Sequence, residues 1–159
     1  MPTRSPRRGF TLIELLLVIG IIAILASIVI VAINPTRQLA LARNTQRRSD
    51  VNTILNAVYQ FAIDNNGNMP GPTGSTNEIP VGTPLQICQV TTDPATCNTT
   101  WGAVSLRMLT GAYLVSIPKD PQVAVGTGTT RYNIKRDTNN RITVGSPGAE
   151  LGVTIDVTR

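Results

Sequence analysis

The chain has 159 residues, of which 42% are hydrophobic and 14% are charged, with 14 Lys and Arg against 9 Asp and Glu. This length predicts one domain of modest size. There is no histidine, which excludes Ser-His-Asp and Cys-His catalysis, a histidine general base and His-ligated zinc. The net charge of +5 suggests a nucleic-acid partner, but three of the basic residues fall within the first nine (Arg4, Arg7 and Arg8).

An apolar run over residues 10–33 contains one charged side chain, Glu14. As a helix the run would span about 36 Å, enough to cross a hydrocarbon core of about 30 Å. An ionised carboxylate inside a membrane segment is costly, so Glu14 needs a partner or a function. Nothing else within the run can pair with it, and we therefore expect its partner to come from another copy of the chain.

Three interpretations of the run compete. A secretory signal peptide has a shorter apolar region, typically about 7–15 residues, followed by a small-residue cleavage site, and no A-x-A pattern follows here. A plain membrane anchor fits the length but leaves Glu14 without a role. The favoured interpretation places cleavage before the run, between Gly9 and Phe10.

The sequence Gly9-Phe-Thr-Leu-Ile-Glu14, with Arg7 and Arg8 before it, favours this third interpretation. Residues 7–33 resemble the N-terminus of the type IV pilin and type II secretion pseudopilin superfamily. The resemblance implies that a prepilin peptidase cleaves after Gly9 and that the amine of Phe10 is N-methylated. Arg7 and Arg8 would hold the cleavage site at the cytoplasmic face. The resemblance also implies that Glu14 pairs with the Phe10 amine of a neighbouring copy and sets the register of assembly.

The resemblance further implies a structural subunit of a type IV pilus-like or type II secretion pseudopilus filament, and not an enzyme. Its partners would be copies of itself in a helical filament, the prepilin peptidase, an assembly ATPase and a platform membrane protein, with no cofactor. The chain would cross the cytoplasmic membrane once, with its head outside, and then enter an extracytoplasmic filament. Arginines at 37, 43, 47 and 48 follow the run, so the leader motif and not the charge count decides this orientation.

The residues that follow the apolar run are predicted to continue the helix. Asn34-Pro35 ends or kinks the first helical stretch, and apolar residues then recur at three- and four-residue steps up to the stop signal Asn65-Asn66-Gly67. We expect one long kinked helix over residues 10–65, with a leader peptide at 1–9, a transmembrane or filament-core part at 10–33 and an amphipathic part at 34–66. The arginines at 43, 47 and 48 either form a solvated face or contact lipid phosphates or acidic groups of neighbouring copies.

Residues 67–159 are expected to form a globular head. A loop rich in Pro and Gly comes first, at 66–84. Cys88 and Cys97 follow; outside the cytoplasm such a pair favours a disulfide, the alternative being two unrelated core residues. No other Cys or His could complete a zinc site. Residues 103–110 resemble a short helix closed by Gly111.

In the last third of the chain, apolar residues alternate with polar ones, which predicts strands at 130–136, 141–145 and 153–157. Together these elements predict an α+β, pilin-like fold, in which the long N-terminal helix packs on a small antiparallel sheet through Leu55, Val58 and Ala62. Residues 113–121 (YLVSIPKDP) also resemble a segment of many pseudopilins, notably the major subunit of type II secretion.

Two further regions of the sequence resemble ligand sites. The major pseudopilin of type II secretion binds calcium in an acidic loop near its C-terminus, but the corresponding residues 145–152 hold one acid here, so no metal site is expected. Four cations surround one predicted hairpin (Arg131, Lys135, Arg136 and Arg141), and clustered cations can contact phosphates. The alternative function is therefore a minor pilin or competence pseudopilin whose head binds DNA or a surface ligand. A membrane-anchored enzyme would need a catalytic constellation that scattered aspartates do not make.

Overall fold

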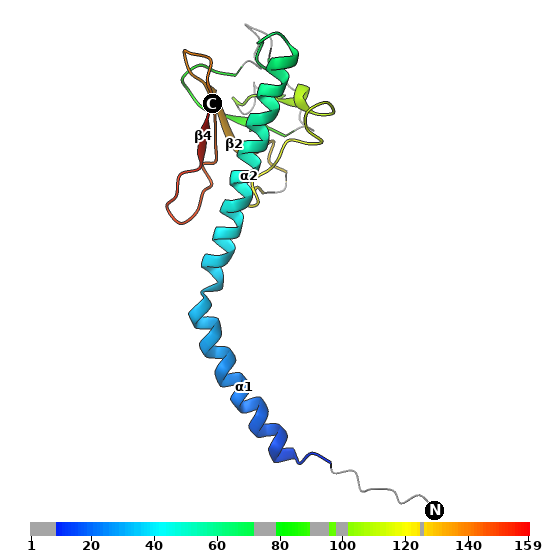
Figure 1. The fold of residues 1–159 in the computed structure, drawn as a ribbon, viewed down its shortest axis with the longest axis vertical. Helices are drawn as coiled ribbons and strands as arrows, with labels where there is room; N and C mark the ends of the chain where they lie inside the picture. The colour runs from blue at the N-terminus through cyan, green and yellow to red at the C-terminus, as the bar shows by residue number, and fades with distance from the viewer. Residues whose placement is uncertain (1–8, 72–78, 90–95, 98–101, 125) are drawn as a thin grey trace, which may run out of the picture. The chain divides into compact units, whose positions relative to one another are not determined.

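A computed structural model describes residues 9–71, 79–89, 96–97, 102–124 and 126–159, and the chain divides into two compact units, 1–39 and 40–159. Figure 1 shows the helices and the sheet. The elements are α1 (Leu12–Ile33), α2 (Pro35–Asp64), β1 (Leu85–Cys88), the 3₁₀ helix η1 (Arg107–Leu109), β2 (Thr129–Arg136), β3 (Ile142–Gly145) and β4 (Asp156–Thr158). An N-terminal apolar helix and a four-stranded antiparallel sheet confirm the predicted α+β class.

Helix α1 dominates the first unit. It is about 33 Å long, from 22 residues at 1.5 Å each, and none of its residues is buried. Asn34 ends it in the left-handed conformation, with φ of 49°. The same residue begins α2, because its Oδ1 accepts hydrogen bonds from the Thr36 hydroxyl and the Arg37 N–H, and Pro35 suits the first position of a helix. The break therefore lies at the predicted Asn34-Pro35 step.

In the second unit, one apolar face of α2 is buried against the head. Val51, Ile54, Leu55 and Val58 are fully buried, as expected from their three- and four-residue spacing. The helix ends at the predicted stop signal: Asn66 and Gly67 adopt positive φ, and the Gly67 N–H bonds to the Ala62 carbonyl. This is the usual glycine termination of a helix.

The four strands form one antiparallel sheet in the order β1-β2-β3-β4. Ile134 of β2 lies opposite Val144 of β3, which lies opposite Val157 of β4. Alternate residues of β2, including Tyr132 and Ile134, point into the core. They pack with the buried stripe of α2 in a single hydrophobic cluster. The core of the head therefore lies between α2 and the sheet.

The predicted helix at 103–110 is wrong except for the short turn η1. Residues 103–106 are not helical, and Val104 bridges Ile87 alongside β1. The Val104 N–H bonds to the Gln86 carbonyl at 2.8 Å, and its own carbonyl accepts the Cys88 N–H at 2.9 Å. Pairing with a distant strand has overridden the local helical pattern.

The last predicted strand is shifted. β4 begins at Asp156 because Leu151 and Gly152 both have positive φ and turn the chain. Of the three residues expected on the buried face, Ile155 is buried, Val157 is half-buried and Val153 is exposed.

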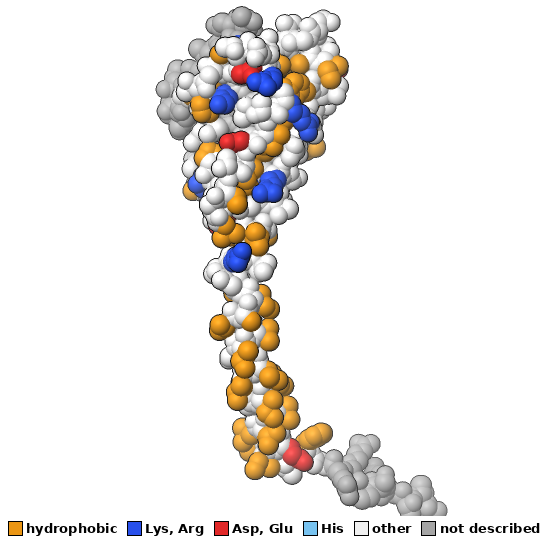
Figure 2. All heavy atoms as spheres, turned by 60° about the vertical axis from the view of Figure 1, so that its left-hand side comes forward, with side chains coloured by type: hydrophobic (Ala, Val, Ile, Leu, Met, Phe, Trp, Pro, Cys, Tyr) orange, Lys and Arg blue, Asp and Glu red, His pale blue; other side chains and the backbone are white. Residues whose placement is uncertain are grey.

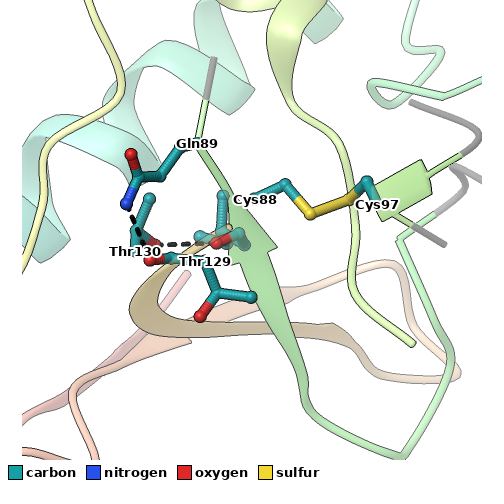
Figure 3. The surroundings of a disulfide bond; sticks show 6 residues. Cys88, Gln89, Cys97, Thr129 and Thr130 are labelled. Atoms are coloured by element: carbon teal, nitrogen blue, oxygen red, sulfur yellow. Dashed lines mark hydrogen bonds between the residues drawn. A yellow bond between two sulfur atoms is a disulfide. The ribbon is translucent and has the colours of Figure 1, made fainter. Parts of the chain in front are cut away.

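A disulfide joins Cys88, at the end of β1, to Cys97 (Figure 3). Both cysteines are buried and cluster with Ala103. The neighbouring Gln89 side chain donates hydrogen bonds to the carbonyls of Thr127 and Thr129, at 2.6 and 3.2 Å. The disulfide and the glutamine therefore hold this end of the sheet from two sides.

Candidate functional site

The start of α1 is built on two side chains, Thr11 and Glu14. Thr11 is the N-cap, and its hydroxyl accepts the Glu14 N–H at 3.3 Å. The Glu14 carboxylate reaches back: its Oε2 accepts the Thr11 N–H and the Thr11 hydroxyl, each at 2.8 Å. This is a capping box, in which N-cap and third-position side chains satisfy N–H groups at the helix start.

The capping box corrects one expectation. Glu14 does have a partner within its own chain, Thr11, which the pattern Thr-x-x-Glu could have revealed. Both of these hydrogen bonds go to Oε2, and no hydrogen bond to Oε1 is found among the described residues. The helix start also favours a negative charge at this point.

The surface around Glu14 is open and apolar. Phe10 is 90% exposed, and a hollow of about 420 Å³ is lined by Phe10, Glu14, Leu15, Leu17 and Val18. Gly9 and Phe10, on either side of the predicted cleavage point, are both exposed. Arg7 and Arg8 lie outside the described residues. The structure thus brings Phe10 and Glu14 to one apolar surface, next to the predicted cleavage point.

The rest of α1 is an unbroken apolar surface. Figure 2 shows hydrophobic side chains along the visible face of the helix, and those of its large aliphatic residues are at least half exposed. Within the described residues, α1 is the one helix long and apolar enough to cross a membrane. A surface of this kind is not stable against water, so it requires a bilayer or other protein to cover it.

A second polar cluster lies in the head, centred on Arg47. The Arg47 and Asp120 side chains are fully buried, with Nε of Arg47 2.7 Å from Oδ2 of Asp120. The guanidinium also donates to Oδ1 of Asp120, to Glu150 and to the side-chain oxygens of Asn44 and Gln122. All five N–H groups of the guanidinium are therefore used.

Arg43 adds a second cation to this cluster. Its Nε and Nη2 bind the two carboxylate oxygens of Glu150, at 2.7 and 2.6 Å. Hydrogen bonds from Arg43 and Arg47 lower the pKa of Glu150 to about 2. Burial alone would raise the pKa of Asp120, but the hydrogen bonds from Arg47 and from the Gln122 N–H outweigh it and lower the pKa. Both carboxylates are thus held in the ionised form.

This cluster corrects the expectation for the arginines of α2. Arg47 faces the interior and Arg43 binds an acid of its own chain, whereas Arg48 remains exposed. The predicted alternatives, a solvated face or contacts to lipid and neighbouring copies, do not apply to Arg47. The single acid of residues 145–152, Glu150, is neutralised by these arginines. Among the described residues, no three His, Cys, Asp or Glu side chains lie close enough together to hold a metal ion.

Two of the four cations around the β2–β3 hairpin, Arg131 and Arg141, lie close to acids of the same chain. Arg141 binds Asp137, with Nε 2.7 Å from Oδ2. Arg131 lies 3.8 Å from Asp120 and donates to the Gln122 carbonyl. Two of the four charges therefore face acids of the same chain, which weakens the case for phosphate binding.

The comparison with known proteins concerns the start of α1, around Gly9 and Glu14. Residues 4–30 match the prokaryotic N-terminal methylation motif, which is the prepilin-type signal of type IV pilins and pseudopilins. The match contains Gly9, Phe10, Thr11 and Glu14, and it confirms the resemblance drawn from residues 7–33. No curated protein and no solved structure is significantly similar to the chain.

Proposed function

We propose that this chain, which carries the prepilin-type signal of type IV pilins and pseudopilins, is a structural subunit of a type IV pilus-like or type II secretion pseudopilus filament. In this proposal it is anchored by α1 with its head outside the cytoplasm, is cleaved after Gly9 and is methylated at Phe10. The observation that carries the proposal is a carboxylate, Glu14, on the first turn of an exposed apolar helix inside the matched motif.

The proposed maturation starts with hydrolysis of the Gly9–Phe10 peptide bond by a prepilin peptidase. Water supplies the atoms that leave a carboxylate on Gly9 and an amine on Phe10. The amine then loses a proton and attacks the methyl group of a sulfonium-type donor, which leaves as a thioether; the resulting N-methyl amine carries the positive charge. The exposed Gly9 and Phe10 support access to this bond.

The new amine is the proposed partner of Glu14 in a second copy. Thr11 holds Oε2, so the incoming amine would bind Oε1. A buried ion pair adds little net stability but is strongly unfavourable when one partner is missing. The pair would therefore select one axial register between neighbouring copies. An assembly ATPase and a platform membrane protein are the proposed drivers of this step.

Covering α1 is the second requirement of assembly. The bilayer would cover it before assembly, and the α1 helices of neighbouring copies afterwards. Gly20, Ala23 and Ser27 are small residues at helical spacing that let helices approach closely. These features support helix packing in the filament.

The experiment separates charge from helix capping. Glu14→Gln retains a side chain that can complete the capping box but removes the charge. We expect the variant to insert and to be processed normally, and to give no extracellular filaments in electron microscopy of sheared surface material. Thr11→Ser, which keeps the cap, is the matched control and should assemble. Normal filaments from Glu14→Gln, or a mature N-terminus other than methylated Phe10 by mass spectrometry, would overturn the proposal.

A further inference from the structure

The buried face of α2 changes from polar to aliphatic along the helix. In its first half the buried polar residues are Asn44, Arg47 and Asp50, at intervals of three residues. In its second half the fully buried residues are aliphatic: Val51, Ile54, Leu55 and Val58. Hydrophobic packing has no preferred direction, whereas hydrogen bonds and ion pairs require defined positions of both partners. The two halves therefore hold the head in physically different ways.

Each of the three polar residues binds a different segment of the head. The Asn44 side chain bonds to a backbone N–H and a backbone carbonyl of the loop between β3 and β4, at 3.0 and 2.9 Å. Nε of Arg47 lies 2.7 Å from Oδ2 of Asp120, in the loop before β2. The Asp50 carboxylate accepts a hydrogen bond from the Tyr132 hydroxyl of β2 at 2.7 Å. Two loops and one strand are thus attached to successive turns of α2.

The aliphatic half does not by itself select one axial position of α2. Val51 and Leu55 are four residues apart, and so are Ile54 and Val58. A displacement of α2 by four residues, about 6 Å at 1.5 Å per residue, would therefore return aliphatic side chains to the apolar core. Such one-turn displacements between packed elements are a known form of conformational change.

Arg47 opposes this displacement in both directions. If Val51 moved to the place of Arg47, the buried carboxylate of Asp120 would lose its cation. If α2 moved the other way, the guanidinium of Arg47 would enter the apolar core at the place of Val51. Either state leaves a buried charge unpaired, which is strongly unfavourable. In the first state Ile54 would also replace the acceptor of the Tyr132 hydroxyl, at a further cost.

We propose that Asn44, Arg47 and Asp50 form a register lock, which holds α2 at one axial position against the head. A buried ion pair is often no more stabilising than apolar residues of the same volume, but a buried polar group can select one packing arrangement among several. All contacts of the lock lie within the unit of residues 40–159. The role therefore goes beyond the proposed function and does not depend on it.

The test removes the lock without leaving a buried charge. In the full chain, Arg47→Met is combined with Asp120→Asn, which keeps an acceptor for the Gln122 N–H. Spin labels carried by unnatural amino acids at the exposed positions 48 and 139 leave the disulfide intact, and pulsed EPR in detergent measures the distance between them. We expect one narrow distance in the wild type. In the double variant we expect a second population, with a distance that differs by up to about 6 Å.

The matched control is Ile54→Val, which trims the apolar core and leaves every contact of the lock in place. It should lower the melting temperature and keep the single distance. Three results would overturn the inference. A single distance in a folded double variant would mean that the apolar core alone sets the register. Loss of folding in the double variant would make the cluster a requirement for folding, and a second distance in Ile54→Val would show that any loosening of the core displaces α2.

Discussion

The guanidinium of Arg47 and the carboxylate of Asp120 meet at 2.7 Å with both side chains fully buried. The two residues are 73 positions apart in the chain, and through them α2 holds the loop that precedes β2. Glu150 and Asn44 attach the loop between β3 and β4 to the same guanidinium. The head is therefore organised around one buried cation as well as around an apolar core.

Arg47→Ala should destabilise the head by about 3–5 kcal/mol, because it leaves the buried carboxylate of Asp120 without its cation. Urea unfolding of the full chain in detergent, followed by circular dichroism, measures the change. The adjacent Arg48→Ala removes an exposed arginine and should change stability by no more than about 0.5 kcal/mol. Equal effects of the two substitutions would show that the buried cluster does not stabilise the fold.

Acid should weaken the head through Glu150. Its pKa is lowered from 4.5 to about 2 in the folded chain, so the folded state binds its proton less readily than the unfolded state does. Its contribution is complete above pH 4.5 and is lost as the pH falls toward 2. Glu150→Gln should therefore melt lower than the wild type at pH 7, and the difference should shrink between pH 4.5 and pH 2. A difference independent of pH would contradict this assignment.

Loss of the disulfide should lower the free energy of unfolding by about 2–4 kcal/mol. The double substitution Cys88→Ala with Cys97→Ala tests this and leaves no thiol in the chain, since these are its two cysteines. A reductant should lower the melting temperature of the wild type and leave that of the double variant unchanged. A wild-type melting curve insensitive to a reductant that demonstrably opens the disulfide would contradict the prediction.

Thr11→Ala should reduce filament yield without abolishing processing. The substitution removes the hydroxyl that bonds to Glu14 and to its N–H, a capping loss of about 0.5–2 kcal/mol, but it leaves the charge. Filament yield should rank Thr11→Ser close to the wild type, Thr11→Ala lower and Glu14→Gln lowest. If Thr11→Ala were as defective as Glu14→Gln while its processing stayed normal, capping rather than charge would be the main function of Glu14.

Local signals in the sequence predicted the two long N-terminal helices and the hairpin of β2 and β3 well. The Asn34-Pro35 break, the stop at Asn65-Asn66-Gly67 and the alternation in β2 and β3 each depend on residues a few positions apart. Thr11-x-x-Glu14 is equally local, and the capping box could have been predicted in the same way.

Contacts between distant residues could not be predicted from such signals. Val104 is extended because it pairs beside β1, and Arg47 is buried because acids more than 70 positions away meet it. An arginine on an amphipathic helix is ordinarily exposed, and no nearby residue indicates otherwise. The candidate site at Glu14 lies in a continuous segment, whereas the Arg47 cluster depends on how the chain folds back on α2.

The Thr11–Glu14 pair has a consequence for the time before assembly. In the proposed pathway each copy waits in the bilayer as a monomer, where a lone carboxylate would be poorly solvated. Two hydrogen bonds from Thr11 replace part of the lost water, which would allow a reservoir of unassembled copies to persist. When a neighbour's amine arrives at the other oxygen, no internal bond has to break first. The threonine would thus make storage and assembly compatible in one helix start.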